Sequence, residues 1–296
     1  MANGERLSMV PHLMVMADGN YLRDERLKTY LSSHAQHRLV LADLTLIEMF
    51  KKNALGTARA SLKILADFPD QIFVLKPTHL WLDAKVHSEA DLQQLVDLDR
   101  SDDLRQLSRD YKSDEAIHSF ADRMKAREIE ASEYMRQLRG QVQTLEASHQ
   151  NLLKEFRAEE LKQIRTAQGI SGALREKIFN LVDEVTVEFV RANQEPGRTA
   201  PLKRSEVHGM FAYRYALCVV IAFTRWVALG RQAKSLDLRV NDVVDNQVAA
   251  TSTFFNEILT KDRELQIVAS NARDVLKHLR AFVRPFPGEA LACRNG

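Results

Sequence analysis

The stretch HLMVMADGN, residues 12–20, determines the fold that we expect, because an apolar run passes directly into a polar cluster. A short run of continuous apolar residues is typical of a strand buried on both faces, as in a parallel sheet. Similar runs follow at 38–42 and 71–75. Segments with the apolar spacing of helices separate these runs, at 22–31, 44–52 and 57–68. Strands that alternate with helices predict right-handed crossovers and a parallel α/β sheet.

The composition is that of a globular protein. The chain has 296 residues, of which 45% are hydrophobic and 28% charged, enough for one large domain or two ordinary ones. A formal net charge of +2 excludes a histone-like nucleic-acid binder but leaves room for a locally basic groove. Cys218 and Cys293 lack the spacing of a disulfide framework, a zinc site or a redox motif.

Two further features bear on location. The first ten residues carry charges and lack the apolar centre of a secretory signal. The apolar run 215–230 contains Arg225 and is shorter than the ~20 residues of a membrane span. We therefore expect this run to be a buried helix, and the protein to be cytoplasmic and free of the membrane.

The distribution of proline predicts the domain organisation. No proline lies between Pro77 and Pro196, and a stretch with so few breakers is expected to be helical, since proline costs ~3 kcal/mol inside a helix. We predict one α/β domain made of residues 11–77 plus 206–283, interrupted by an inserted helical region at 78–205. In the second half of the domain we expect helices at 211–229, 243–256 and 272–282, and strands at 257–260 and 266–269.

A heptad seam runs through the inserted region from Ile117 to Phe156, with Glu128 and His149 as its polar members. A helix of this length would extend roughly 60 Å at 1.5 Å per residue. One interpretation is a coiled-coil-like arm that forms a homo-oligomer or holds a protein partner. The other is a helical hairpin whose seam packs on other helices of the insertion, with His149 a tolerated polar residue rather than a ligand.

Acidic residues follow the predicted strands near both ends of the chain. Asp18 follows the first strand, and Asp262 follows a short strand near the other end. Ligands of an open parallel sheet bind beyond the carboxyl ends of its strands, so these two acids are expected to meet. Glu48 lies on the helix after the second strand, and Asp242 and Asp245 share one helix face. Clustered carboxylates need a neutralising cation, and oxygen ligands of this kind suit Mg²⁺ or Mn²⁺.

The sequence around these acids resembles the PIN-like nuclease family. That family has a first strand ending in Asp with an Asn two residues later, an acid on an early helix, an Asp opening a helix of small apolar residues, and an Asp after a strand ending in Thr. The matching segments are VMADGNYL at 15–22, LTLIEMFK at 44–51, DNQVAAT at 245–251 and ILTKD at 258–262. The resemblance covers roughly half of the chain, and the inserted region 78–205 departs from the small PIN-like toxins.

The resemblance implies a parallel-sheet α/β/α domain and a metal-dependent ribonuclease, most simply an endoribonuclease acting as a toxin or defence effector. It implies four catalytic metal ligands, namely Asp18, Glu48, Asp245 and Asp262. Auxiliary roles would fall to Asn20, Asp242 and Thr260. Phosphate contacts would come from Lys51, Lys52, Lys261 and Arg263. The implied cofactor is Mg²⁺ or Mn²⁺, and the implied partner is nucleic acid, RNA rather than DNA.

Each acid also has a purely structural interpretation. Asp18 would cap the following helix, Glu48 would pair with Lys51 or Lys52 on the surface, and Asp262 would lie in a turn. Asp242 would be a helix N-cap, with Asp245 in the first turn. Asp43 is expected to cap the helix 44–52 and is excluded from the site.

Two alternatives to the nuclease remain open. One is a catalytically silent PIN-like scaffold that uses its helical arm for interactions. The other is a phosphatase of the haloacid-dehalogenase type, which needs a second Asp two residues after the first. That position is Asn20 in this chain, so the phosphatase ranks below the nuclease.

Overall fold

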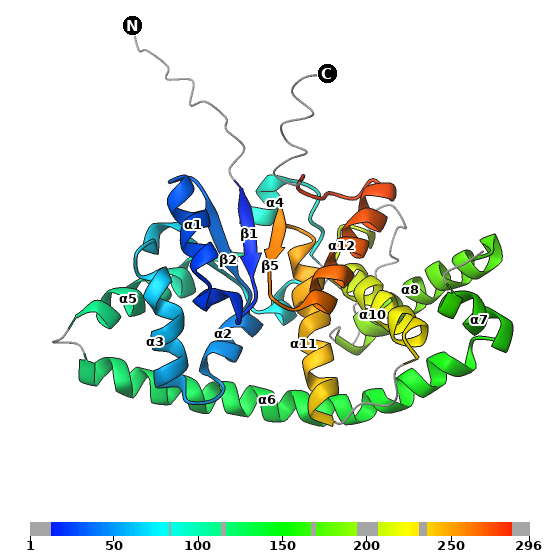
Figure 1. The fold of residues 1–296 in the computed structure, drawn as a ribbon, viewed down its shortest axis with the longest axis horizontal. Coiled ribbons are helices and arrows are strands. Elements are labelled where there is room, and N and C mark those ends of the chain that lie inside the picture. Colours follow the sequence, from blue (N-terminus) through cyan, green and yellow to red (C-terminus); the bar gives the residue numbers. More distant parts are fainter. Residues whose placement is uncertain are drawn as a thin grey trace, which may run out of the picture.

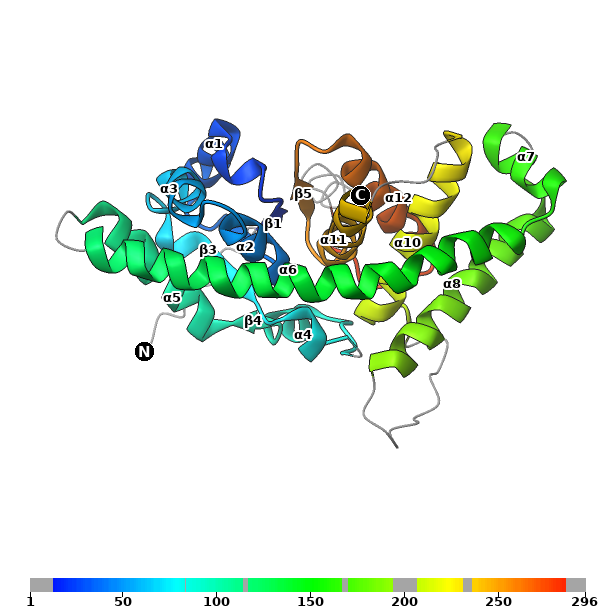
Figure 2. The same ribbon diagram turned by 90° about the horizontal axis from the view of Figure 1, so that it is seen from below.

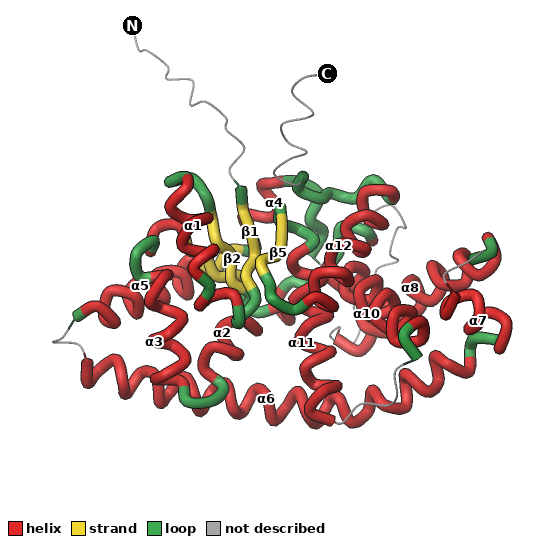
Figure 3. Tube along the Cα trace, in the orientation of Figure 1, coloured by secondary structure: helices red, strands yellow, loops and turns green. Residues whose placement is uncertain are grey.

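The computed structural model describes residues 13–82, 84–113, 117–166, 170–193, 207–230 and 236–285. Its centre is a five-stranded sheet with the order β4-β3-β2-β1-β5. Figure 3 shows β2, β1 and β5 next to one another in yellow. The strands are β1 (Met14–Ala17), β2 (Arg38–Leu41), β3 (Ile72–Leu75), β4 (Val96–Asp97) and β5 (Glu257–Leu259). All neighbouring pairs are parallel except β3 and β4. The expected mixed α/β class with a mainly parallel sheet is therefore confirmed.

The strands are buried on both faces, as continuous apolar runs require. Val15 and Ala17 of β1 face one hydrophobic core, whereas Met16 between them faces the other. Leu39 and Leu41 of β2 alternate with Val40 in the same way. Helices on either side of the sheet complete the two cores, which gives three layers.

The helices in the described part of the chain vary from single turns to one very long helix. Those before the long helix are η1 (Tyr21–Arg23), α1 (Glu25–Ser33), α2 (Asp43–Phe50), α3 (Ala54–Leu65), η2 (Pro69–Gln71), η3 (Thr78–Leu80), α4 (Glu89–Gln93) and α5 (Leu98–Lys112). The long helix and those after it are α6 (Ile117–Lys154), α7 (Ala158–Thr166), α8 (Gly172–Asn193), α10 (Phe211–Ala228), α11 (Leu236–Ser252) and α12 (Arg263–His278).

Helix α6 runs along the whole molecule below the sheet and contacts α2, α3, α5 and α11 (Figures 1 and 2). The seam residues Met124, Ala131, Leu138 and Val142 are buried. Their partners belong to the two cores of the same chain, so the described part of the seam packs intramolecularly, and more on the α/β domain than on a hairpin within the insertion. The side chain of His149 lies outside the described residues.

Two details of the predicted organisation were wrong. The inserted region is not purely helical, because β4 joins the sheet, pairing antiparallel with β3. Residues 266–269 are not a strand but part of α12, whose buried residues Leu265, Val268 and Leu276 recur with helical spacing.

Helix α10 is the one described helix that is long and apolar enough to cross a membrane by length and composition. Of that 18-residue window, 61% is buried inside the protein. Its burial agrees with the expected buried helix, since α10 packs on α8, α11 and α12.

Two arginines, Arg214 and Arg273, are buried, although arginine side chains are usually exposed. The guanidinium of Arg214 lies over the ring of Phe254 and donates to the Thr253 hydroxyl (3.0 Å) and to the carbonyl of Phe282 (2.6 Å). Burial, together with the neighbouring charge of Arg273, lowers its pKa to about 9. Arg214 thereby ties the segment after α12 to the end of α11.

Candidate active site

Asp18 lies where β1 ends, beside β5. Its backbone N–H donates to the carbonyl of Leu259 (3.0 Å), which joins the two strands at their carboxyl ends. The Thr260 hydroxyl donates to Oδ2 of Asp18 at 3.1 Å. Burial raises the pKa of the Asp18 carboxyl, and the negative charge of Glu48 raises it further. Asn20, not Asp18, is at the N-cap of the following turn, so the capping interpretation of Asp18 was wrong.

Glu48 projects from α2 towards the same end of the sheet. The Lys51 ammonium, one turn further along the chain, donates to Oε1 of Glu48 at 3.0 Å. The other oxygen, Oε2, packs against Gly19, where an added Cβ would lie 3.1 Å from it. Glu48 therefore forms the ion pair with Lys51 that its structural interpretation predicted, but inside the pocket that also contains Asp18.

Asp245 comes from α11, in the half of the domain that follows the insertion. Its pKa is raised to about 7, first by burial and then by the negative charges of Asp262, Asp18 and Glu48, in that order. The charge of Asp242, its neighbour on α11, adds a smaller effect in the same direction, so the Asp245 carboxyl lies among acids from several elements. Because α11 extends from Leu236 to Ser252, Asp242 is not at its N-cap and Asp245 is not in its first turn, so the structural interpretation of that pair was wrong.

Asp262 has a structural role as well as a place in the pocket. Its Oδ1 accepts hydrogen bonds from the backbone N–H groups of Glu264 (2.7 Å) and Leu265 (3.0 Å), which makes it the N-cap of α12. Its own N–H donates to the Thr260 hydroxyl at 2.9 Å. Thr260 thus links Asp262 to Asp18, because its hydroxyl accepts from one and donates to the other.

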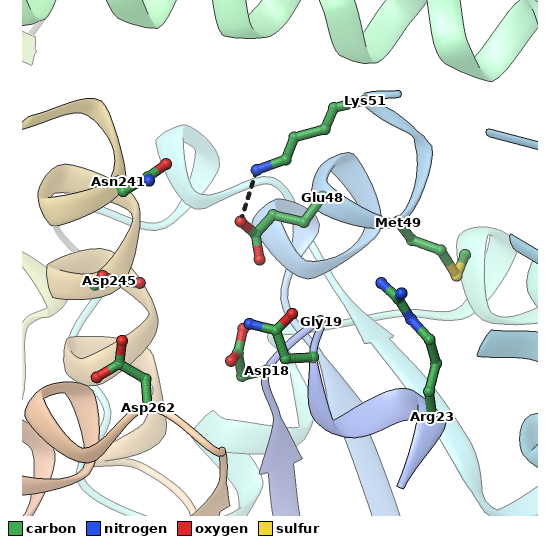
Figure 4. A pocket seen from close by; sticks show the side chains of 10 residues that line it. Asp18, Gly19, Arg23, Glu48, Met49, Lys51, Asn241, Asp245 and Asp262 are labelled. Carbon is green, nitrogen blue, oxygen red and sulfur yellow. Dashed lines mark hydrogen bonds and ion pairs between the residues drawn. The ribbon is translucent and has the colours of Figure 1, made fainter. Parts of the chain in front are cut away.

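All four predicted acids line one pocket of about 270 Å³ between α2 and α11 (Figure 4). Its lining residues are Asp18, Gly19, Asn20, Arg23, Glu48, Met49, Lys51, Asn241, Asp245 and Asp262. The pocket lies at the end of β1, which has β2 on one side and β5 on the other. The strand order reverses there, and open α/β sheets bind their ligands at such a switch point. No three His, Cys, Asp or Glu side chains among the described residues already surround one point closely enough to form a metal site.

Of the auxiliary residues predicted from sequence, the pocket contains Asn20 and Lys51. Thr260 acts behind it through Asp18, and Asp242 does not line it. Lys52, Lys261 and Arg263 also lie outside the lining, and Lys261 pairs with Asp24 at 3.1 Å.

Sequence reasoning missed two polar lining residues, Arg23 and Asn241, besides the apolar Met49. Arg23 is exposed and has no partner among the described residues, and Figure 4 shows its side chain reaching towards Gly19 and Met49. Asn241 precedes Asp245 by four residues and therefore lies on the same face of α11. The i, i+4 spacing was a signal for Asn241. For Arg23 the only signal in the sequence was that it lies five residues after Asp18.

Asp43 is not the predicted N-cap, since α2 begins at Asp43 and its cap is Ala42. The buried carboxylate of Asp43 accepts hydrogen bonds from the hydroxyl (3.0 Å) and the backbone N–H (3.1 Å) of Thr78. It anchors the chain after β3 to the start of α2, which leaves it outside the pocket as expected.

Comparisons of the chain with protein-family models, with curated proteins and with solved structures gave no match. The functional argument therefore rests on the residues of the pocket and their chemistry. The pocket has an acidic side, formed by four carboxylates, and two cationic side chains, Arg23 and Lys51. Such an arrangement suits a ligand that combines a cation with a phosphate group.

Proposed function

We propose that this protein is a PIN-like, metal-dependent nuclease that hydrolyses phosphodiester bonds, with RNA as its substrate and an endonucleolytic mode of cleavage. One observation carries the proposal. Four carboxylates from elements far apart in the sequence line a single pocket at the switch point of a parallel sheet. Burial and the negative charges of the other three raise the pKa of Asp245 to about 7, a cost in stability that a fold retains where the acids serve a site.

The donor set fits Mg²⁺ or Mn²⁺. Carboxylate oxygens of Asp18, Glu48, Asp245 and Asp262, with the amide oxygens of Asn20 and Asn241 nearby, are the hard ligands these ions prefer. When bound, such an ion lowers the pKa of a coordinated water and neutralises charge on the phosphate.

The chain's own residues supply the remaining parts. Thr260 orients Asp18 by donating to Oδ2, and Gly19 leaves room for the Glu48 carboxylate beside it. Arg23 and Lys51 would bind phosphate oxygens from the side opposite Asp245 and Asp262, which fixes the backbone of a polynucleotide relative to the acids. Lys261 and Arg263, which lie outside the pocket lining, would contact phosphates further along the strand.

A catalytically silent scaffold is the second candidate. It is favoured by one observation, namely that no three acids in the described part of the chain are already gathered around a single point. In that case the exposed side of α6 would be the surface for a protein partner or a second copy, because the buried side of its described seam is occupied by the chain itself.

The test is cleavage of labelled single-stranded RNA, with single-stranded DNA of the same sequence alongside. We expect RNA cleavage in Mn²⁺, none with a chelator, and a loss of at least about a hundredfold in Asp18→Asn. Asp274→Asn is the matched control, because Asp274 is exposed on α12 and has no partner among the described residues. Cleavage that survives both the chelator and Asp18→Asn would contradict the mechanism, and absence of cleavage in every metal would favour the scaffold.

A further inference from the structure

The Lys51–Glu48 ion pair lies inside the pocket rather than on an open surface. The Lys51 side chain is 30% exposed and that of Glu48 is 23% exposed, and both line the pocket. Figure 4 shows the Lys51 side chain pointing towards the carboxylate of Glu48. Among the described residues, no other Lys or Arg forms an ion pair with Asp18, Glu48, Asp245 or Asp262.

Within the part of the chain that the structure describes, this ammonium group is therefore the one cation that directly neutralises the acid cluster. It compensates one negative charge of four, and Asp245 is still left with a pKa raised to about 7. Glu48 as a metal ligand would share its carboxylate with Lys51, because the ammonium already holds Oε1, while Oε2 lies on the Gly19 side of the pocket. Lys51 and a divalent ion would then compete for the same carboxylate.

We propose that Lys51 exchanges partners during the working cycle, an inference that rests on the proposed function. Without metal, Lys51 holds Glu48. When Glu48 takes up the divalent ion, the Lys51 ammonium is released into the pocket, where it binds a phosphate oxygen of the substrate. Metal binding and RNA binding are thereby coupled through one side chain, and the coupling is reciprocal. Lys51 thus positions Glu48 when no metal is bound, and it contacts the substrate directly when metal is bound.

Lys52 provides a matched control from the next position in the chain. Its side chain is exposed, does not line the pocket, and has no partner among the described residues. Removing the charge of Lys52 changes the field at the acids only through solvent, where salt screens it. Removing the charge of Lys51 also removes the direct competitor for Glu48.

The experiment measures Mn²⁺ binding to the full chain by isothermal titration calorimetry. It compares the wild type with Lys51→Met, Lys51→Arg and Lys52→Met. We expect Lys51→Met to bind Mn²⁺ about three- to tenfold tighter than the wild type. Lys51→Arg, which keeps the cation, and Lys52→Met should both remain within about twofold. A gain in affinity is not what a merely structural role would produce.

The second measurement is binding of a fluorescent, non-cleavable 2′-O-methyl oligoribonucleotide, with and without Mn²⁺. The wild type should bind it more tightly in Mn²⁺ than without it. In Lys51→Met, the ratio of the RNA affinities with and without Mn²⁺ should be about fivefold smaller than in the wild type. An Mn²⁺ affinity of folded Lys51→Met that is unchanged or weaker overturns the exchange, as does an equal loss of RNA affinity with and without Mn²⁺. A wild type that binds no Mn²⁺ overturns the proposed function as well, so the two failures are distinct.

Discussion

Asp245 should make the metal-free protein measurably less stable at neutral and alkaline pH. Its folded-state pKa is about 7, against an ordinary value of 3.8. Between these two values the folded chain retains a proton that the unfolded chain has released, so the free energy of unfolding falls as the pH rises through this window. Each tenfold change in an acid constant is worth ~1.36 kcal/mol, which sets an upper limit of about 4 kcal/mol above the folded-state pKa.

The substitution Asp245→Asn removes the charge that the pocket must accommodate. We expect it to raise the free energy of unfolding by about 2 kcal/mol at mildly alkaline pH, less than the limit because water and the neighbouring acids adjust to the charge in the wild type. At acidic pH, where the wild-type carboxyl is protonated in both states, the difference should vanish.

The assay is urea denaturation followed by circular dichroism, in the presence of a chelator, at a series of pH values. Asp274→Asn serves as the control, since its exposed carboxylate should give no such pH-dependent gain. The reasoning is refuted if Asp245→Asn is less stable than the wild type at alkaline pH, or if the difference in stability is the same at every pH. The pKa of Asp245 would then not be raised by burial and the neighbouring acids. Adding Mn²⁺ should reverse the ranking, because the wild type then gains stability from ligand binding.

Three further substitutions test other parts of the structure. Gly19→Ala places a methyl group 3.1 Å from Oε2 of Glu48, so RNA cleavage should fall about tenfold while the melting temperature changes little. Arg23→Met should weaken RNA binding and reduce the slope of log affinity against log salt concentration by about one, as measured by fluorescence anisotropy. Arg214→Met leaves the carbonyl of Phe282 without its donor and should lower the free energy of unfolding by about 3 kcal/mol in urea titrations.

The sheet could be predicted from the sequence because each central strand is a continuous apolar run. The same reasoning failed where a strand has no apolar run and where an apolar run belongs to a helix. Strand β4 consists of Val96 and Asp97 alone, and two residues carry no periodicity. The apolar residues at 266–269 fit a buried strand as well as a helix, and the N-cap Asp262 was the signal that favoured the helix.

The acids of the pocket were predictable because strand ends fix where side chains emerge. Asp18 follows β1 and Asp262 comes three residues after β5, so the parallel pairing of these strands brings them to the same edge. Arg23 was missed since its approach to the pocket depends on the short helix η1, of which it is the last residue. Such a turn depends on packing rather than on a pattern of residues.

The pairing of β1 with β5 joins positions at opposite ends of the chain, since the N–H of Met14 donates to Oδ1 of Asn256 across 242 positions. During synthesis on a ribosome, Asp18 and Glu48 emerge about two hundred residues before Asp245 and Asp262. Contacts so distant along the chain form late in folding. A nascent chain that still lacks Asp245 and Asp262 therefore has two of the four pocket carboxylates and no finished pocket, which would keep the proposed nuclease inert beside the messenger RNA that is being translated.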